Sequence, residues 1–225
     1  MSKCLVVAAA LVALAAPAFA ADVAAPAVTY DWSGPYIGAQ VGYGWARDHI
    51  RDSEHGVPNV SDYDDHFNMD GGIGGVFAGY NFQRDNLVFG AEADAEIAGV
   101  NGDNSAWPFG DSMTAKVTAQ GSLRGRIGYA FDSSLVYFTG GLAIANIKTR
   151  YQTGPNVDSF SSTHAGWTVG VGVEHAFTPN WIVRAEYRYS DFGTVTDWTQ
   201  TADPFTDYHN SITEHAVRIS LAYKF

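Results

Sequence analysis

Residues Met113–Phe131 read MTAKVTAQGSLRGRIGYAF, and along this stretch apolar and polar side chains alternate. One set of alternate positions is apolar or small, whereas the other carries Lys116, Arg124 and Arg126. Successive side chains of a β-strand point to opposite faces of its sheet. The stretch therefore predicts a long strand with one apolar face and one charged face.

Eight segments of the chain follow this alternation, some of them with many glycines on one side. Each is long enough to cross a bilayer as a tilted strand. We therefore predict eight strands. The segments are Tyr36–Arg47, Gly71–Phe82, Leu87–Gly99, Met113–Phe131, Leu135–Tyr151, His164–Phe177, Trp181–Gly193 and Glu214–Phe225.

The connections between these segments are short and long by turns. The short ones are Asn81–Asn86, Asp132–Ser134 and Thr178–Asn180. The long, polar ones are His49–Asn68, Asn101–Ser112, Gln152–Thr163 and Thr194–Thr213. Tight turns at one rim and long loops at the other are typical of an outer-membrane barrel.

Aromatic residues decide which face meets lipid, since alternation alone also fits a soluble barrel with a charged exterior. One aromatic group lies beside the short connections and a second lies toward the long ones, as two membrane interfaces require. The first comprises Phe82, Tyr129, Phe131, Phe177, Trp181, Tyr223 and Phe225, and the second Tyr43, Trp45, Trp167, Tyr187 and Tyr189. The sequence thus predicts an all-β, eight-stranded antiparallel up-and-down transmembrane barrel.

The charged face would then line the lumen, where an unpaired charge is costly. Acidic and basic residues on consecutive strands are placed to form cross-strand pairs. We expect a salt-bridge network that fills a narrow interior, and the alternative is an ion pathway. The predicted members are Glu92, Asp94, Glu96, Lys116, Arg124, Arg126, Arg184, Glu186, Arg188 and Arg218.

Composition and the N-terminus point to an exported protein. The chain has 225 residues and a formal net charge of −11, which argues against a nucleic-acid binder. Residues 1–20 resemble a signal peptide with Ala18 and Ala20 before a cut at Ala21. We expect a periplasmic lead-in over 21–35 and the barrel over 36–225. The only cysteine, Cys4, lies in the predicted leader, so the mature chain would form no disulfide.

Candidate reactive groups do not form a recognisable catalytic set. His175 and His215 fall at opposite rims, and neither has an obvious serine and carboxylate beside it; nothing singles out His164. We therefore expect no enzyme, metal or cofactor.

In the acidic segment His49–Asp70, the motif Asp62-x-Asp64-x-His66 starts like a calcium loop but lacks its glycine and distal glutamate. We therefore expect a solvated loop. The alternative is that its carboxylates hold divalent cations that bridge lipopolysaccharide phosphates. A second alternative is a haem site in the loops, since His and Tyr can bind haem iron. Its candidate ligands are Tyr63, His66, Tyr208 and His209.

Four motifs of the chain are distinctive: DWSGPYIG at Asp31–Gly38, the segment Gly166–Phe177, WIVRAEYRYSDFG at Trp181–Gly193 and AVRISLAYKF at Ala216–Phe225. They resemble the small outer-membrane β-barrels of alphaproteobacteria, a family similar to opacity proteins and the OmpA transmembrane domain. The resemblance implies an outer-membrane location with short turns in the periplasm and loops outside. It also implies that the outer-membrane assembly machinery reads the C-terminal strand. The residues of that signal are Ile219, Leu221, Tyr223 and Phe225.

The leading functional hypothesis is a structural surface protein of the envelope. The alternatives are a narrow porin and a loop-mediated adhesin or haem receptor. Expected partners are outer-membrane lipid and lipopolysaccharide, with the assembly machinery and periplasmic chaperones during biogenesis; the sequence does not identify an external ligand.

Overall fold

The computed structural model describes residues 30–54, 64–104, 112–153, 156–197 and 206–225. These residues form eight strands. In chain order the strands are β1 Gly34–Glu54, β2 Asp64–Arg84, β3 Leu87–Asn104, β4 Ser112–Phe131, β5 Ser134–Thr153, β6 Asn156–Ala176, β7 Trp181–Asp197 and β8 Thr206–Lys224.

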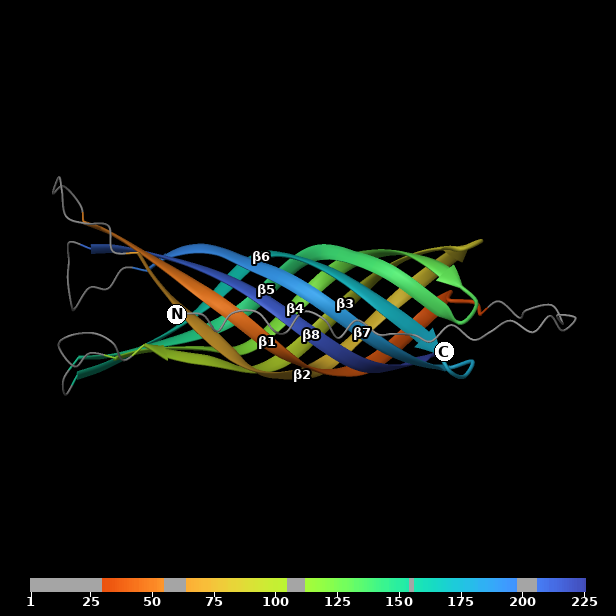
Figure 1. Cartoon of the computed structure of the whole chain (residues 1–225), viewed down its shortest axis with the longest axis horizontal. Helices are drawn as coiled ribbons and strands as arrows, with labels where there is room; N and C mark the ends of the chain where they lie inside the picture. Colours follow the sequence, from red (N-terminus) through yellow and green to blue (C-terminus); the bar gives the residue numbers. More distant parts are fainter. Residues whose placement is uncertain (1–29, 55–63, 105–111, 154–155, 198–205) are drawn as a thin grey trace, which may run out of the picture.

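Each strand pairs antiparallel with the next, and β8 returns to pair with β1, which closes the barrel. The strands run obliquely to the long axis, and the C-terminus lies at the end with the short turns (Figure 1). Every strand thus has a paired neighbour on both sides, although β6 and β7 pair only from Trp167 and Asp191 to Ala176 and Ile182. The predicted eight-stranded antiparallel barrel is confirmed. Over the described ranges, no helix is long and apolar enough to span a membrane.

The strands reach further toward the loop rim than predicted. β1 pairs with β2 as far as Arg51 and Asp64, and with β8 as far as Glu54 and Thr206. Much of the predicted loop sequence is therefore paired strand. The alternation of apolar and polar residues is weaker in these extensions, because a sheet with water on both faces needs no apolar face. The strands nevertheless stay paired through their backbone hydrogen bonds.

The outer face of the barrel carries large apolar side chains that are open to the surroundings. Ile97, Leu142 and Val41 are 76%, 68% and 66% exposed. Near the turns, the rings of Trp181 and Tyr223 lie 5.2 Å apart. Toward the loops, Trp45 stacks on His215 at 6.0 Å, and Trp167 lies 5.4 Å from Tyr189. An apolar band between two aromatic groups fits a surface covered by lipid.

Inside, two apolar clusters lie above and below a charged middle layer. β3 displays this order directly: Val88 is followed by three acidic residues and then by Ala98 and Val100. The turn-side cluster comprises Trp32, Tyr36, Phe77, Val88, Ala130, Leu135, Tyr137, Ala176, Ile182 and Ala222. The loop-side cluster comprises Ala46, Met69, Ile73, Ala98, Val100, Val117, Ala143, Ala145, Ile147, Phe192, Ile212 and Ala216.

Two lumen tyrosines each lie against a glycine of the neighbouring strand. Tyr36 pairs with Gly79, and Tyr137 pairs with Gly172. A Cβ on Gly172 would lie 2.4 Å from the Tyr137 hydroxyl and 2.8 Å from the Ala185 carbonyl oxygen. Glycine at this position therefore makes room for the ring whose hydroxyl reaches the charged layer.

We expect Gly172→Ala to destabilise the barrel by about 1–3 kcal/mol, because the added methyl group must displace Tyr137 or the β7 backbone. Urea unfolding in lipid vesicles measures the effect. Gly72→Ala is the matched control, since a Cβ there meets nothing within 4 Å. Equal stability of the two variants would contradict the close contact.

Candidate functional site: the charged lumen

The middle layer of the lumen contains five arginines and six carboxylates, all at most 8% exposed. They project from β3, β4, β6, β7 and β8, because the inward positions of these strands are the polar set of the alternation. The arginines are Arg124, Arg126, Arg184, Arg188 and Arg218, and the acidic residues are Glu92, Asp94, Glu96, Glu174, Glu186 and Glu214.

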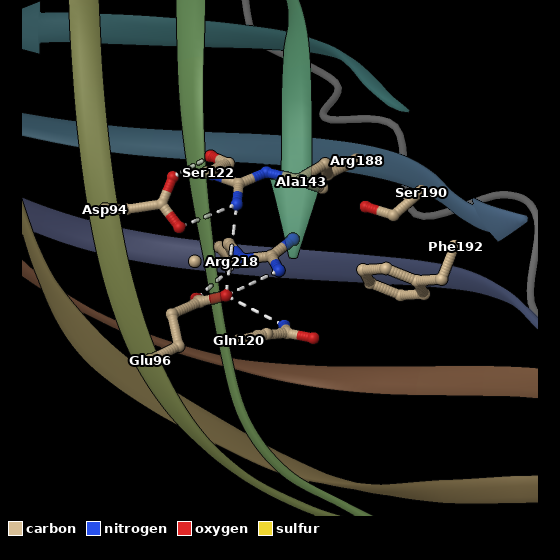
Figure 2. Close-up of a pocket in the computed structure, with 10 residues that line it drawn as sticks. Asp94, Glu96, Gln120, Ser122, Ala143, Arg188, Ser190, Phe192 and Arg218 are labelled. Carbon is tan, nitrogen blue, oxygen red and sulfur yellow. Dashed lines mark hydrogen bonds and ion pairs between the residues drawn. The ribbon is translucent and has the colours of Figure 1, made fainter. Parts of the chain in front are cut away.

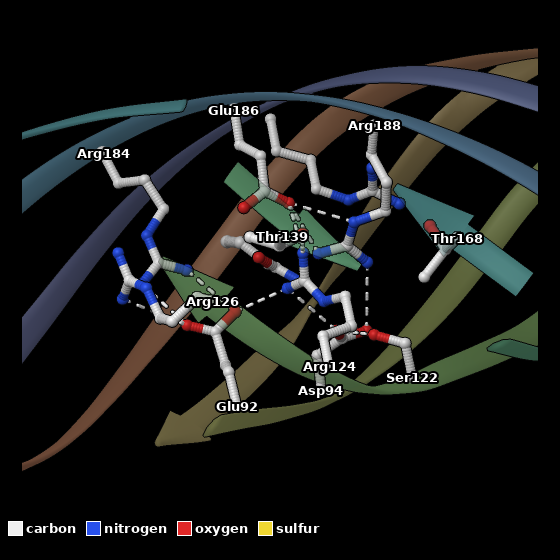
Figure 3. A network of polar contacts seen from close by, with 12 residues as sticks. Glu92, Asp94, Ser122, Arg124, Arg126, Thr139, Thr168, Arg184, Glu186 and Arg188 are labelled. Carbon is white, nitrogen blue, oxygen red and sulfur yellow. Dashed lines mark hydrogen bonds and ion pairs between the residues drawn. The ribbon is translucent and has the colours of Figure 1, made fainter. Parts of the chain in front are cut away.

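Arg124 lies at the centre of the network (Figure 3). Its Nη2 lies 2.5 Å from Glu92 Oε1 and 3.2 Å from Asp94 Oδ2, and its Nη1 lies 2.9 Å from Glu186 Oε1. Nη1 also donates to Thr139 Oγ1 at 2.9 Å. One planar guanidinium thus joins carboxylates of two strands, which a lysine ammonium would do less well.

On the turn side of Arg124, two arginines share two glutamates. Arg184 Nη2 lies 2.8 Å from Glu92 Oε2, and its Nε lies 2.7 Å from Glu174 Oε1. Arg126 Nη2 contacts the same Glu174 oxygen at 2.8 Å. The guanidinium of Arg126 lies 4.2 Å from the ring centre of Tyr137, so the ionic layer joins the apolar cluster through a cation–π contact.

On the loop side, Arg188 and Arg218 contact the remaining acids, including Glu214, whose Oε1 lies 3.7 Å from Arg218 Nη2. Arg188 Nη2 lies 2.8 Å from Glu186 Oε1, and Arg218 Nε lies 2.9 Å from Glu96 Oε1. Gln120 Nε2 donates to Glu96 Oε2 at 2.8 Å. Figure 2 depicts a cavity beside these groups, and its volume of about 10 Å³ is at the lower limit for holding one water molecule.

Lys116, predicted to line the lumen, is exposed on the outer face, and that prediction is wrong. The reason is a β-bulge in β4: Val117 pairs with Ile147 of β5, but Ala119 pairs with the next residue, Asn146. The extra residue, Thr118, reverses the alternation beyond it. Val117 consequently points inward and is 1% exposed.

Sequence reasoning omitted two network members, Glu174 and Glu214. Both side chains lie at inward positions of their strands. Glu174 is on the polar side of its alternating segment, so the alternation could have identified it as a lumen residue. The other nine predicted lumen residues lie in the network.

The described end of the lead-in, Tyr30–Ser33, packs at the turn end of the lumen. Trp32 is fully buried in the turn-side cluster, and its backbone N–H donates to Gln83 Oε1 at 2.7 Å. The Tyr30 hydroxyl donates to the Pro179 carbonyl at 3.1 Å. Burial raises the pKa of Tyr30 to about 12, so the hydroxyl keeps the proton that it donates. The predicted leader, 1–20, lies outside the described residues.

The predicted aromatic groups and the C-terminal residues lie on the outer face. The rings of Tyr223 and Phe225 are 5.2 Å apart, and the Phe225 backbone N–H donates to the Pro35 carbonyl at 3.1 Å. The alternate residues Ile219 and Leu221 are 66% and 44% exposed. This end of β8 presents a continuous apolar row.

The three histidines considered as candidate reactive groups lie in separate places. His175 lies 3.0 Å from Ser134 Oγ near the turns, and His215 lies 2.6 Å from the Tyr187 hydroxyl toward the loops. His164 contacts Ser162 Oγ at 2.7 Å. In the described part of the chain, no group of three or more His, Cys, Asp or Glu side chains could hold a metal ion.

The loop candidates fall outside this description. Tyr63 is outside the described residues, as are the side chains of His66, Tyr208 and His209.

Comparisons with known proteins agree with the fold. A family model described as the outer membrane protein beta-barrel domain matches residues 6–225. The chain is 36% identical over 220 residues to the 31 kDa outer-membrane immunogenic protein of Brucella melitensis, covering 91% of this chain and 88% of that protein. It is 34% identical over 236 residues to the 25 kDa outer-membrane immunogenic protein of Brucella abortus, covering 100% and 99%. Its backbone resembles the crystal structure of Neisserial surface protein A, with a TM-score of 0.42, 19% identity and coverage of 86% and 98%.

We expect Arg124→Met to destabilise the folded barrel by about 3–5 kcal/mol, because it leaves buried carboxylates without their shared cation. The free energy of unfolding in lipid vesicles is the measurement. Arg84→Met, at an exposed position near the turns, should change it by less than about 0.5 kcal/mol. A loss at Arg124 no larger than this would contradict the central role of its guanidinium.

Proposed function

The chain belongs to the outer membrane protein β-barrel family, and we propose that it serves there as a closed structural barrel of the cell surface. In this role it strengthens the envelope and presents its loop rim to the outside. The observation that carries the proposal is a lumen whose five arginines all pair with buried carboxylates between two apolar clusters.

A pore requires a continuous hydrated path. Here Arg124 joins acids of β3 and β7 across the interior, and Trp32 closes the turn end below it. An eight-stranded barrel has an interior just wide enough for side chains, whereas porins of 16–18 strands leave an aqueous channel. The filled lumen therefore favours a structural barrel over a narrow porin.

The lumen charges also favour a structural role over an enzymatic one. Glu92 and Glu186, which would be natural acid–base candidates, are each held by arginines and by a tyrosine hydroxyl. The two Brucella relatives are named for their location and immunogenicity and not for an activity. We therefore propose that the protein has no enzymatic activity.

The outer face suggests the partners. An apolar band meets membrane lipid, and the loop rim would meet the lipopolysaccharide of the outer leaflet. We propose that the C-terminal row from Ile219 to Phe225 is the signal read by the assembly machinery, after periplasmic chaperones have delivered the chain. The immunogenicity named for the Brucella relatives supports exposure of the loop rim at the surface.

Planar-bilayer recording of the refolded protein tests the proposal. We expect no conductance steps from protein whose heat-shifted gel mobility demonstrates folding, because paired charges and apolar clusters block the lumen. A 16-stranded porin recorded in the same bilayer is the positive control. Reproducible steps that change on neutralising Arg124 would contradict the proposal and favour the porin alternative.

A further inference from the structure

Two lysines lie directly opposite each other on the outer face. Lys116 of β4 is the register partner of Lys148 of β5, and both side chains are exposed. Among the side chains that the structure describes, neither lysine has an ion-pair partner. Like charges at directly opposed positions destabilise a sheet, so this pair has a cost that the fold itself does not explain.

The pair exists because of the bulge in β4. If β4 continued through Thr118 in regular alternation, without the bulge, Lys116 would point into the lumen and Lys148 would pair with Val117. The bulge is held in place by the Thr118 hydroxyl, which donates to the Asn146 carbonyl at 3.2 Å and to Asn146 Oδ1 at 3.0 Å. A fixed local irregularity thus brings two ammonium groups together on the outside.

The neighbours in the same row are polar and uncharged. Asn101 of β3 pairs with Lys116, and Ser161 of β6 pairs with Lys148; both are exposed. None of the four residues in this row is acidic. The Ser161 hydroxyl donates to Asn146 Oδ1 at 3.3 Å, so the uncharged donor that this row offers is the Asn101 amide. An amide donor beside two positive charges is the chemistry that an oxyanion such as phosphate requires.

The height of the row on the barrel indicates which anion reaches it. On β5 the outward Leu142 and Ile144 are 68% and 53% exposed, so they belong to the lipid-facing band. Lys148 follows four residues later, about 10 Å further along the barrel axis for a tilted strand. This places the two lysines in the headgroup layer on the loop side, directly above the acyl chains.

We propose that Lys116 and Lys148 form a binding site for a phosphate group on the headgroup of an outer-leaflet glycolipid. The lipid's acyl chains would lie against the apolar face of β4 and β5 below, and its phosphate would bridge the two ammonium groups and relieve their repulsion. The site rests on the proposed function, because it requires the loop rim to face the outer leaflet.

The test uses the full-length mature protein in phosphatidylcholine nanodiscs that contain diphosphoryl lipid A, with bound lipid A counted by native mass spectrometry. Removing one lysine should weaken binding roughly five-fold, and the double variant Lys116→Gln/Lys148→Gln roughly 25-fold. Arg47→Gln, at an exposed position of β1 away from this row, should leave binding within about two-fold. Equal losses for Arg47→Gln and the lysine variants would overturn the site in favour of diffuse attraction.

A charge reversal separates binding from folding. Lys148→Glu should raise the thermal midpoint in discs without lipid A, because it turns a repulsive pair into an attractive one, and should abolish the stabilisation by lipid A. Retained lipid A stabilisation in this variant would overturn the proposal.

Two probes identify the source of the anion. Dephosphorylated lipid A and inorganic phosphate should both fail to stabilise the wild-type protein. Stabilisation by inorganic phosphate alone would overturn the lipid as the ligand. If the barrel conducts no ions and does not bind lipid A, only the proposed lysine site is refuted. If the barrel conducts ions and still binds lipid A, only the proposed closed lumen is refuted.

Discussion

The barrel depends on the pairing of five buried arginines with six buried carboxylates in an interior that side chains fill. A buried arginine or carboxylate without a partner costs several kcal/mol, so every member of the layer constrains the others. The contacts join β3, β4, β6, β7 and β8, and a one-residue slip of any of these strands would turn its charges toward lipid. Pairing in the lumen therefore fixes the strand register as firmly as the apolar exterior does.

The apolar clusters make this pairing effective. They place buried apolar side chains at both ends of the ionic layer, and charge–charge attraction is stronger where the local dielectric is low. At the turn end the cluster includes Trp32, which precedes the first strand, and the Lys224 ammonium donates to the backbone carbonyl of Asp31. The start of the barrel is thereby joined to its last strand, where β1 and β8 close the cylinder.

Much of this arrangement could be predicted from alternation. The eight strands, their lipid-facing sides and nine of the charged lumen residues follow from a period of two, because a strand with one apolar face leaves little freedom in orientation. The paired charges of Glu92 and Arg124 could be anticipated for the same reason, since they lie on consecutive strands.

The remainder depends on features that a period of two does not contain. A bulge adds one residue to a strand and has no distinctive amino-acid composition. The sequence around Thr118 therefore did not indicate that Lys116 would face outward. Inward apolar residues such as Val100 and Ile147 are indistinguishable by type from lipid-facing ones, so the clusters that close the lumen were missed. Strand pairing beyond the membrane continues through backbone hydrogen bonds. These bonds do not depend on side-chain polarity, so the pattern of apolar and polar residues does not predict them.

Whether the lumen is closed to water is tested most directly by the accessibility of a single cysteine at Thr139, which lies beside Arg124 and is 7% exposed. The chain's only cysteine, Cys4, is in the predicted leader, so Thr139→Cys would be the one thiol of the mature protein. A charged thiosulfonate reagent should leave this thiol unmodified in the folded barrel and modify it fully after unfolding, whereas the exposed Ser161→Cys should react in both states. Modification of the folded Thr139→Cys protein at the rate of the Ser161→Cys protein would contradict a closed lumen.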